Sequence, residues 1–275
     1  MDATGNKVFD QDDQSWENYS RGRPQVPDAF FDRIFAYHEG KGGQFGTVHD
    51  VGAGNGPYAK RLRARFAHVI VSDIVPTNVQ PAQKRLRGLD GFAFRAAKLE
   101  EADDIPAGSI DMVFATNVMH FPDPQDAAMA VVARQLRSGG TFAAGTFGPA
   151  RFPDPELQAL WTRISQQGGR SLLQTVDDPE TTAKIMARTG GVNNVAPLRP
   201  DFFTGLDDVE VFEEEAGWDF ETDLEGVKAH FASFPFVSKF PDAFTELYKE
   251  LDQLLADGRR VKGYFPAKII LATRR

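Results

Sequence analysis

Short apolar runs alternate with segments of helical periodicity between residues 47 and 146, and this alternation limits the chain to few folds. The apolar runs have the length of strands, and the segments between them are long enough to be helical crossovers. The predicted strands lie at Thr47–Val51, His68–Ser72, Phe92–Arg95, Ile110–Ala115 and Thr141–Thr146, and the predicted helices at Gly56–Phe66, Val79–Arg87 and Pro124–Leu136. We therefore expect an α/β fold with a doubly wound, Rossmann-like and mostly parallel seven-stranded sheet.

The composition excludes several kinds of chemistry. The chain has 275 residues and no cysteine, which excludes disulfides, zinc–thiolate sites, iron–sulfur clusters and thiol nucleophiles. Its 31 basic and 39 acidic side chains give a net charge of −8, which argues against binding to nucleic acid because phosphate recognition needs clustered basic residues. The sequence has neither a signal-peptide pattern nor an apolar stretch of about 18 residues for a membrane span, so we expect a cytoplasmic protein.

The stretch from Val48 to Tyr58 joins the first predicted strand to a helix through the sequence Gly52-Ala53-Gly54-Asn55-Gly56. Glycines permit positive φ angles and a close approach of a ligand to the backbone, and the following helix directs free N–H groups at the turn. A dinucleotide-binding turn follows the pattern G-x-G-x-x-G/A, whose last position is Pro57 in this chain. The spacing therefore disfavours a dinucleotide at this strand end.

The observed pattern, Asp50-x-Gly52-x-Gly54-x-Gly56, resembles the first motif of the class I S-adenosylmethionine-dependent methyltransferases. In that family the turn lies against the amino acid part of the cofactor, where no phosphate is present. The resemblance therefore implies that S-adenosyl-L-methionine is the cofactor, and that Asp50, Gly52, Ala53 and Gly54 contact it.

Two further segments match the family in the same order along the chain. Asp73 ends the second predicted strand, where a carboxylate accepts both ribose hydroxyls in the family, and Ile74 beside it would lie on the adenine face. The turn Ala97-Lys98-Leu99-Glu100 resembles the family's adenine-contacting turn, but Lys98 stands where the family usually has an acid. We therefore expect adenine to be bound by the backbone at Lys98 and by Leu99.

The loop after the fourth predicted strand should approach both ligands, because strand ends converge on the ligand crevice of such a sheet. We expect Ala115 and Asn117 to contact the cofactor. His120 is the candidate general base, because an imidazole accepts a proton near neutral pH; the alternative is a histidine that only orients the loop. Tyr19 is the second catalytic candidate, as part of a lid over the cofactor, and a packed tyrosine is its alternative.

Residues 16–24 resemble the Tyr-x-x-x-Arg-Pro segment that precedes the core in small-molecule methyltransferases of the trans-aconitate methyltransferase type. The layout of the chain is also similar to that of methyltransferases of fungal secondary metabolism. Nine of the 23 phenylalanines lie between Phe202 and Phe244, which favours an apolar or aromatic substrate. The expected substrate-lining residues are Arg23, Met119, Phe121 and Phe147.

The regions outside the alternating core are expected to cover the site. Beyond residue 149 the sequence predicts helices at 154–167, 178–189 and 242–255, an acidic segment at 207–225, and a last strand at Tyr264–Thr273. Four parts are expected: an N-terminal lid with the first helices (1–40), the cofactor-binding α/β core (41–149), a helical cap over the substrate with a strand near 209–213 (150–240), and the last helix and strand that complete the sheet (241–275).

The motifs together predict an enzyme that transfers a methyl group to an oxygen of a small organic molecule, such as a secondary metabolite or a carboxylic acid. Nitrogen, sulfur and carbon acceptors are less favoured. The alternative is a methyltransferase-like protein that binds the cofactor and catalyses another reaction, because a fold does not determine a function. No metal is expected, since no compact Asp and Asn cluster follows the fourth strand, and the enzyme is expected to act as a monomer or homodimer without nucleic acid or membrane partners.

Overall fold

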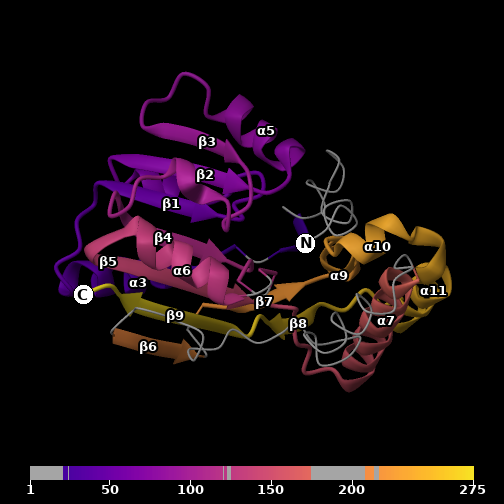
Figure 1. Ribbon diagram of the computed structural model, residues 1–275. Coiled ribbons are helices and arrows are strands. Elements are labelled where there is room, and N and C mark those ends of the chain that lie inside the picture. The colour runs from indigo at the N-terminus through magenta and orange to yellow at the C-terminus, as the bar shows by residue number, and fades with distance from the viewer. Residues whose placement is uncertain (1–20, 24, 120, 123–124, 175–207, 214–216) are drawn as a thin grey trace.

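The computed structural model describes residues 21–23, 25–119, 121–122, 125–174, 208–213 and 217–275 of the chain. Their largest element is a seven-stranded sheet with the order β3-β2-β1-β4-β5-β9-β6 (Figure 1). Its strands are β1 (Thr47–Val51), β2 (His68–Asp73), β3 (Phe92–Ala96), β4 (Ile110–Thr116), β5 (Leu136–Phe147), β6 (Asp208–Glu213) and β9 (Ala267–Thr273). Strands β1 to β5 run parallel to their neighbours, whereas β9 is antiparallel to β5 and β6. The predicted fold class is therefore confirmed.

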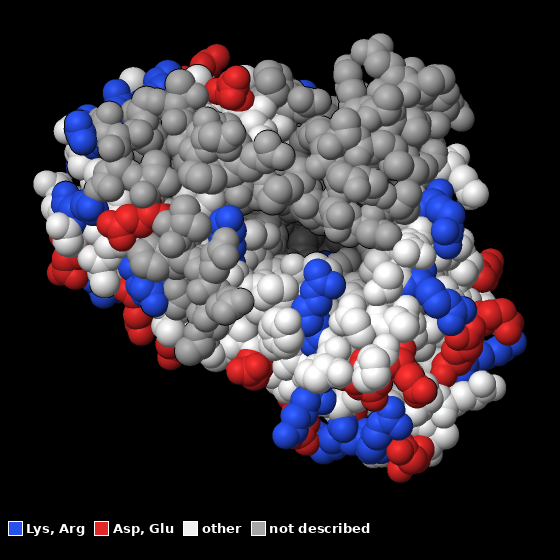
Figure 2. Space-filling model, turned by 90° about the horizontal axis from the view of Figure 1, so that it is seen from below, with Lys and Arg blue, Asp and Glu red and all other residues white. Residues whose placement is uncertain are grey.

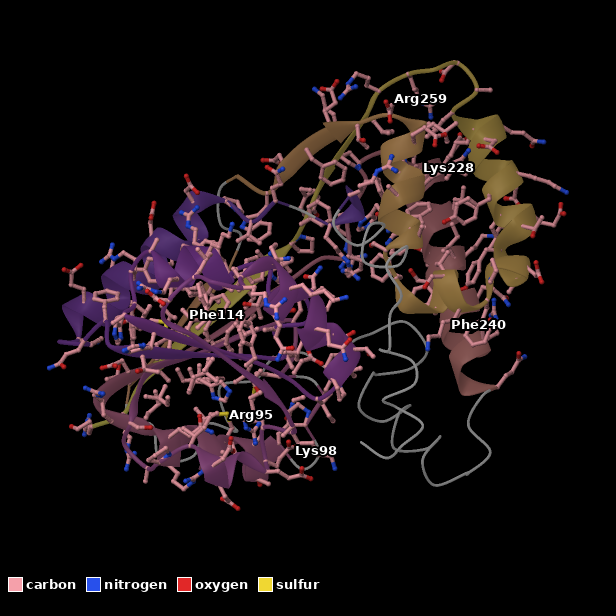
Figure 3. All side chains as sticks on the ribbon, turned by 90° about the horizontal axis from the view of Figure 1, so that it is seen from above. Arg95, Lys98, Phe114, Lys228, Phe240 and Arg259 are labelled. Atoms are coloured by element: carbon pink, nitrogen blue, oxygen red, sulfur yellow. The ribbon has the colours of Figure 1, made fainter. Side chains whose placement is uncertain are left out.

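Helices cover both faces of this sheet. One face carries α3 (Asp28–Gly40), α4 (Ala59–Arg63) and α5 (Pro76–Arg85), and the other carries α6 (Gln125–Gln135) (Figures 1 and 3). Strand β4 lies in the middle, and its side chains alternate between two apolar clusters, with Phe114 in the cluster of α3 and Val113 in that of α6. Burial on both faces explains why β4 is a continuous apolar run in the sequence. No helix in the described part of the chain is long and apolar enough to cross a membrane.

A second group of elements, which we call the cap, lies beyond the carboxyl ends of the parallel strands (Figure 1). It consists of α7 (Pro155–Leu173), β7 (Asp219–Thr222), α9 (Leu224–Ala232), α10 (Pro235–Lys239), η3 (Pro241–Phe244), α11 (Thr245–Leu254) and β8 (Val261–Tyr264). Trp161 of α7 stacks on Phe231 of α9 with ring centroids 4.6 Å apart, and Phe234 lies 4.9 Å from the same indole. The cap therefore has an aromatic core of its own, to which the phenylalanine-rich segment contributes.

The end of the chain differs from the prediction. The single strand predicted at Tyr264–Thr273 is two strands: β8 pairs with β7 in a separate two-stranded sheet, and only β9 joins the large sheet. Pro266 lies between them and has no N–H with which to continue a strand ladder. The break lets one short segment serve both the cap and the core.

Two predicted helices have different lengths in the structure. Helix α4 begins at Ala59 rather than Gly56, because Gly56 has a φ angle of 68° and still belongs to the turn. Helix α7 continues past its predicted end near residue 167, through a glycine at which a Cβ would lie 2.1 Å from the ring of Phe236. Gly168 therefore serves close packing between α7 and α10 and does not end the helix. The helix predicted at 178–189 lies outside the described residues.

Candidate active site

The turns after the parallel strands are tied together by the backbone. Ala53 N, in the turn after β1, donates to Ser72 O of β2 at 2.9 Å, and Ala97 N, after β3, donates to Asp73 O at 3.1 Å. These turns form one rim along the sheet edge that faces the cap (Figure 1). In a doubly wound sheet, ligands bind at this edge.

The turn after β1 is built from glycines in a left-handed conformation. Gly52, Gly54 and Gly56 have φ angles of 61°, 54° and 68°. A Cβ on Gly52 would lie 2.3 Å from the side chain of Val118, which belongs to the loop after β4. Glycine at this position therefore satisfies both the backbone conformation and the contact that joins the two loops.

Asp50, on β1, is a buried carboxylate directly beneath this turn. Its side chain is 2% exposed, and Oδ2 has no hydrogen-bond partner among the residues that the structure describes. Burial, and secondarily the charge of Asp73, raises the pKa of Asp50 well above its usual range. A buried carboxylate oxygen without a donor is costly, and a positively charged ligand group such as an ammonium would stabilise it.

Asp73 ends β2 and connects the neighbouring turns. Its Oδ2 accepts a hydrogen bond from Gly54 N at 2.8 Å, and its Oδ1 accepts from Val75 N at 2.9 Å and from Asn78 Nδ2 at 3.3 Å. Burial raises the pKa of Asp73, and these hydrogen bonds oppose the shift. Asn78 and the backbone N–H groups of Gly54, Ile74 and Val75 already donate to this carboxylate, so ribose hydroxyls would share its oxygens with these donors or displace them. The two buried carboxylates suit a ligand that carries an ammonium and sugar hydroxyls.

The turn after β3 contains the two predicted adenine-binding residues. The ammonium of Lys98 lies 3.5 Å from Glu101, and the Leu99 side chain is 6% exposed and packs in the apolar cluster of α6. Ile74, after β2, is half-buried. The guanidinium of Arg95 holds this turn through several carbonyls, a role that the sequence analysis missed. An arginine inside a predicted buried strand was the signal that would have found it.

The loop after β4 is fixed to the end of β5. Asn117 has a φ angle of 54°, rare for a residue other than glycine, and its Oδ1 accepts a hydrogen bond from Phe147 N at 2.9 Å. The Ala115 side chain is fully buried in the apolar cluster of α6, so only its backbone can face a ligand. Asn117 therefore sets the geometry of two strand ends at once.

Two of the predicted substrate-lining residues, Arg23 and Phe147, contact aromatic rings outside the parallel strands. Arg23 lies over the Phe234 ring, with its guanidinium carbon 4.1 Å from the ring centroid. Phe147 is 4% exposed, and its ring lies 5.0 Å from Trp218, an aromatic partner that precedes β7 and that sequence reasoning did not single out. Nothing in the local pattern around Trp218 indicated this contact, because it depends on the tertiary fold.

Of four other predicted residues, the structure describes two. Met119 is 2% exposed, and its carbonyl accepts a hydrogen bond from the Gln125 side chain; Phe121 is half-buried. His120 and Tyr19 lie outside the described residues. The two described residues flank position 120 in sequence and belong to the loop that packs on the glycine turn.

Two buried histidines have structural hydrogen bonds. His49 Nδ1 bonds to Gln135 Oε1 at 2.8 Å, while His230 Nδ1 donates to Gly22 O at 2.7 Å and its Nε2 accepts from Ala150 N at 3.2 Å. Burial is the main cause that lowers the pKa of His49 to about 4 and that of His230 to about 3. Both are therefore neutral near pH 7, and His230 joins the N-terminal segment to the cap.

The described residues contain no group of three His, Asp or Glu side chains arranged to hold a metal ion.

Residues 49–144 match a family described as a methyltransferase domain. The chain is 58% identical to Methyltransferase nsrG of Aspergillus novofumigatus over 98% of both proteins. It is 52% identical to Methyltransferase AacuQ of Aspergillus aculeatus, over 99% of this chain and 97% of that protein.

Solved structures share the fold at low sequence identity. One is a candidate type II methyltransferase from Anaeromyxobacter dehalogenans, with a TM-score of 0.55, 23% identity and coverage of 91% of this chain and 97% of that one. Another is phosphoethanolamine N-methyltransferase 2 of Haemonchus contortus, solved with S-adenosylhomocysteine, with a TM-score of 0.51 and 14% identity over 100% of this chain and 61% of that one.

Proposed function

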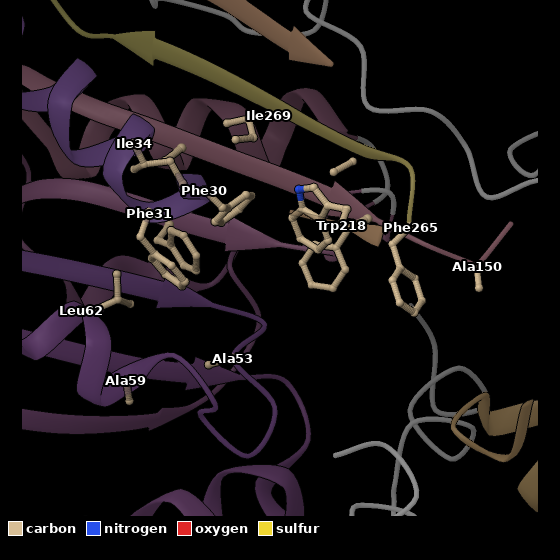
Figure 4. Close-up of a cluster of buried hydrophobic side chains, with 14 of the residues drawn as sticks. Phe30, Phe31, Ile34, Ala53, Ala59, Leu62, Ala150, Trp218, Phe265 and Ile269 are labelled. Carbon is tan, nitrogen blue, oxygen red and sulfur yellow. The ribbon is translucent and has the colours of Figure 1, made fainter. Parts of the chain in front are cut away.

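This chain belongs to the S-adenosylmethionine-dependent methyltransferases, and we propose that it methylates an oxygen of a small apolar or aromatic molecule. The observation that carries the proposal is the aromatic cluster on the cap side of the rim. Phe147 and Trp218 lie with ring centroids 5.0 Å apart, and Phe265 N donates to Trp218 O at 3.0 Å (Figure 4). The surface is hollowed at the middle of the face shown in Figure 2. An apolar acceptor suits aromatic surroundings.

The core binds the cofactor in this proposal. The glycine turn lies along the amino acid part, with the free oxygen of Asp50 accepting from the ammonium, and Asp73 accepts the ribose hydroxyls. Ile74 and Leu99 lie on either side of the adenine ring. When bound, the cofactor supplies a methyl group on a positively charged sulfur, which an acceptor receives by in-line displacement.

The loops after β4 and β5 orient the acceptor. Asn117 holds the two loops together through Phe147 N, so that Met119, Phe121 and Phe147 keep their positions beside the glycine turn. Arg23 approaches from the N-terminal segment and would bind a carboxylate or another polar group of the substrate. A carboxylate acceptor is already ionised at neutral pH, whereas a phenol has a pKa of about 10 and needs a base.

His120 and Tyr19 complete the proposal. His120, on the loop after β4, would take the proton of a phenolic acceptor, and Tyr19 would close over the cofactor from the N-terminal segment. In the proposed division of labour, residues 41–149 bind the cofactor, and the cap and the segment around Arg23 cover the acceptor, whereas α3 packs on the sheet and β6 extends it. The relatives come from fungi, and we expect a secondary metabolite as substrate of a cytoplasmic monomer or homodimer.

The test is to incubate the purified protein with methyl-labelled S-adenosylmethionine and a panel of phenols, aromatic carboxylic acids and amines. The proposal predicts S-adenosylhomocysteine and a methyl ether or ester in equal amounts, both absent with the Asp73→Asn variant. Labelling of amines alone would overturn the oxygen acceptor. Conversion of a substrate without S-adenosylhomocysteine would instead favour the alternative of a cofactor-binding protein that catalyses another reaction.

A further inference from the structure

The segment between β3 and β4 lacks the internal support that a helix would give it. Its only regular element is η1 (Ala102–Asp104), and a cavity of about 260 Å³ lies between the segment and the sheet, lined by Ile70, Arg95 and Asp104 among others. Backbone carbonyls outside a helix or strand need other donors when they are buried. Within the segment from Ala97 to Ile105, backbone N–H groups donate to Leu99 O and Ala102 O, and arginine side chains donate to the carbonyls of Ala97, Lys98, Glu101 and Ile105.

Arg95, the fourth residue of β3, supplies most of these donors. Its side chain is 8% exposed, and all three guanidinium nitrogens donate: Nε to both Asp104 carboxylate oxygens at 2.9 Å, Nη1 to Ala97 O at 3.2 Å and Lys98 O at 2.9 Å, and Nη2 to Glu101 O at 2.8 Å. The ion pair lowers the pKa of Asp104. A single planar group thus fixes both ends of the turn that follows β3.

A second arginine holds the remainder of the segment from the opposite side. Arg134 of α6 donates through Nη1 to Ile105 O at 3.0 Å and through Nη2 to Ala102 O at 2.5 Å. Figure 3 shows Arg95 and Lys98 close together on the α6 side of the sheet. The two guanidinium groups therefore hold the segment along its length, and of the two only Arg95 reaches the part next to Asp73.

We propose that Arg95 is a positioning residue for the adenine ring of the cofactor. Ala97 N donates to Asp73 O, so the turn held by Arg95 begins beside the carboxylate that the proposed function assigns to ribose. Lys98 cannot replace the acid usual in the family, because its ammonium donates hydrogen bonds and accepts none; it lies 3.5 Å from Glu101. The wall beside adenine is consequently backbone, and its position depends on Arg95. This inference rests on the proposed cofactor site.

The experiment compares Arg95→Lys with the matched control Arg63→Lys. Arg63 also bridges loop carbonyls, donating to Phe66 O and Asp90 O at 3.1 Å each, but it lies outside the cofactor rim. Lysine retains the charge and loses the planar fork, so Arg95→Lys should raise the dissociation constant of S-adenosylhomocysteine about 10-fold. The dissociation constant of 5′-methylthioadenosine, which shares the adenine ring, should rise by the same factor. In Arg63→Lys, both dissociation constants should stay within about 2-fold of those of the unchanged protein.

The kinetic readout separates positioning from general damage. Arg95→Lys should raise the KM for S-adenosylmethionine by the same factor and leave the KM for the methyl acceptor unchanged. Asp104→Asn should have a smaller effect, because the three carbonyl bonds of Arg95 remain. Equal affinity of Arg95→Lys and the unchanged protein would overturn the inference, whereas failure of the unchanged protein to bind S-adenosylhomocysteine would overturn the proposed function.

A measurement on the unchanged protein covers the case in which Arg95→Lys does not fold. Hydrogen exchange of the amides from 97 to 105 should slow on addition of S-adenosylhomocysteine, because adenine would lie on a backbone wall. Amides around Asp90, which precedes the amino end of β3, serve as the internal control, and their exchange rates should not change. Unchanged exchange in residues 97–105 would overturn the inference.

Discussion

The cofactor side of the core and the interior of the cap hold their buried side chains by different means. On the cofactor side, Asp50 and Asp73 are buried carboxylates whose pKa values are raised mainly by burial, beside left-handed glycines, and Asp73 accepts from backbone N–H groups. In the cap, Trp161, Phe231 and Phe234 pack ring against ring. Buried carboxylates are costly without a ligand and are specific for one set of donors, whereas packed aromatic rings are stable by themselves.

This difference matches the two ligands that a methyltransferase must accommodate. The cofactor is the same in every turnover, so fixed polar groups at 2.8–3.3 Å from their partners can be matched to it. In the proposed function the acceptor side is apolar and depends on shape, so a change of aromatic side chains there would change the substrate. Substitutions in the cap should therefore affect stability, and substitutions on the rim should affect cofactor binding.

The largest effect is expected in the cap. Trp161 is 2% exposed and stacks on Phe231, so Trp161→Ala should lower the free energy of unfolding by about 3–5 kcal/mol. The variant that remains folded should bind S-adenosylhomocysteine as the unchanged protein does. Urea unfolding and calorimetry measure the two quantities, and a large loss of cofactor affinity in folded Trp161→Ala would break the distinction between cap and core.

The next effect is expected on the rim. Here we expect a large change in cofactor affinity and a smaller change in stability. Asp73→Asn keeps the size of the side chain but replaces one acceptor oxygen by a donor, so affinity for S-adenosylhomocysteine should fall about 100-fold. Stability should fall less than in Trp161→Ala: the amide NH2 would face the backbone N–H of Gly54 or of Val75, and relief of the buried charge offsets part of that cost. The control is Asp104→Asn, because the Asp104 side chain is 59% exposed. This variant should keep most of the affinity for S-adenosylhomocysteine. Wild-type affinity in Asp73→Asn would remove this residue from the site.

The glycine turn offers a third comparison within the core. Gly52→Ala forces a Cβ to within 2.3 Å of Val118 at a φ of 61°, so we expect a loss of about 2–3 kcal/mol in stability. Gly139 has a φ angle of 75°, and a Cβ there would meet open space. Gly139→Ala should therefore lower stability only through backbone strain, by about 1 kcal/mol. Adding Val118→Ala should restore part of the loss at Gly52 and none at Gly139. Equal costs at both glycines, measured by urea unfolding, would contradict the contact between the loops.

The smallest effect concerns pH and returns to the cap. His230 has a folded pKa of about 3 against 6.5 when unfolded, so below pH 6.5 the unfolded chain binds the extra proton. Stability from this residue is complete above pH 6.5 and falls by roughly 1.4 kcal/mol per unit as the pH drops toward 3. Between pH 7.5 and 5.5, His230→Gln should lose about 1 kcal/mol less than the unchanged protein. His68→Gln, an exposed site, is the control, and parallel urea-unfolding profiles for all three proteins would contradict this role.

The sequence predicted the core better than the cap for a physical reason. On the cofactor side the chemistry lies in consecutive residues: a strand, the turn Gly52–Gly56 and a helix, then an acid at the end of the next strand. The local pattern therefore carries both the fold and the expected contacts of Asp50 and Asp73. Expected bounds in the core differed where a turn conformation intervened, as at Gly56, and β5 begins at Leu136 rather than at Thr141.

The cap depends on contacts between distant segments, which no local pattern reveals. Trp218 meets Phe147 only because β7 lies beside the end of β5, and Pro266 divides the last strand between two sheets. An arginine in a predicted strand marks Arg95 as unusual, but its carbonyl partners carry no sequence signature, so the sequence did not show what it holds. The substrate cannot be read from a region whose specificity arises from such contacts.

Calorimetric titration of the unchanged protein with S-adenosylhomocysteine tests the central claim most directly. The account predicts a saturable one-to-one complex with a dissociation constant below about 1 mM, no binding of NADH, and loss of most of the affinity in Asp73→Asn. A folded protein that binds NADH, or that gives no heat with S-adenosylhomocysteine at several temperatures, would contradict the assignment of the rim as the cofactor site.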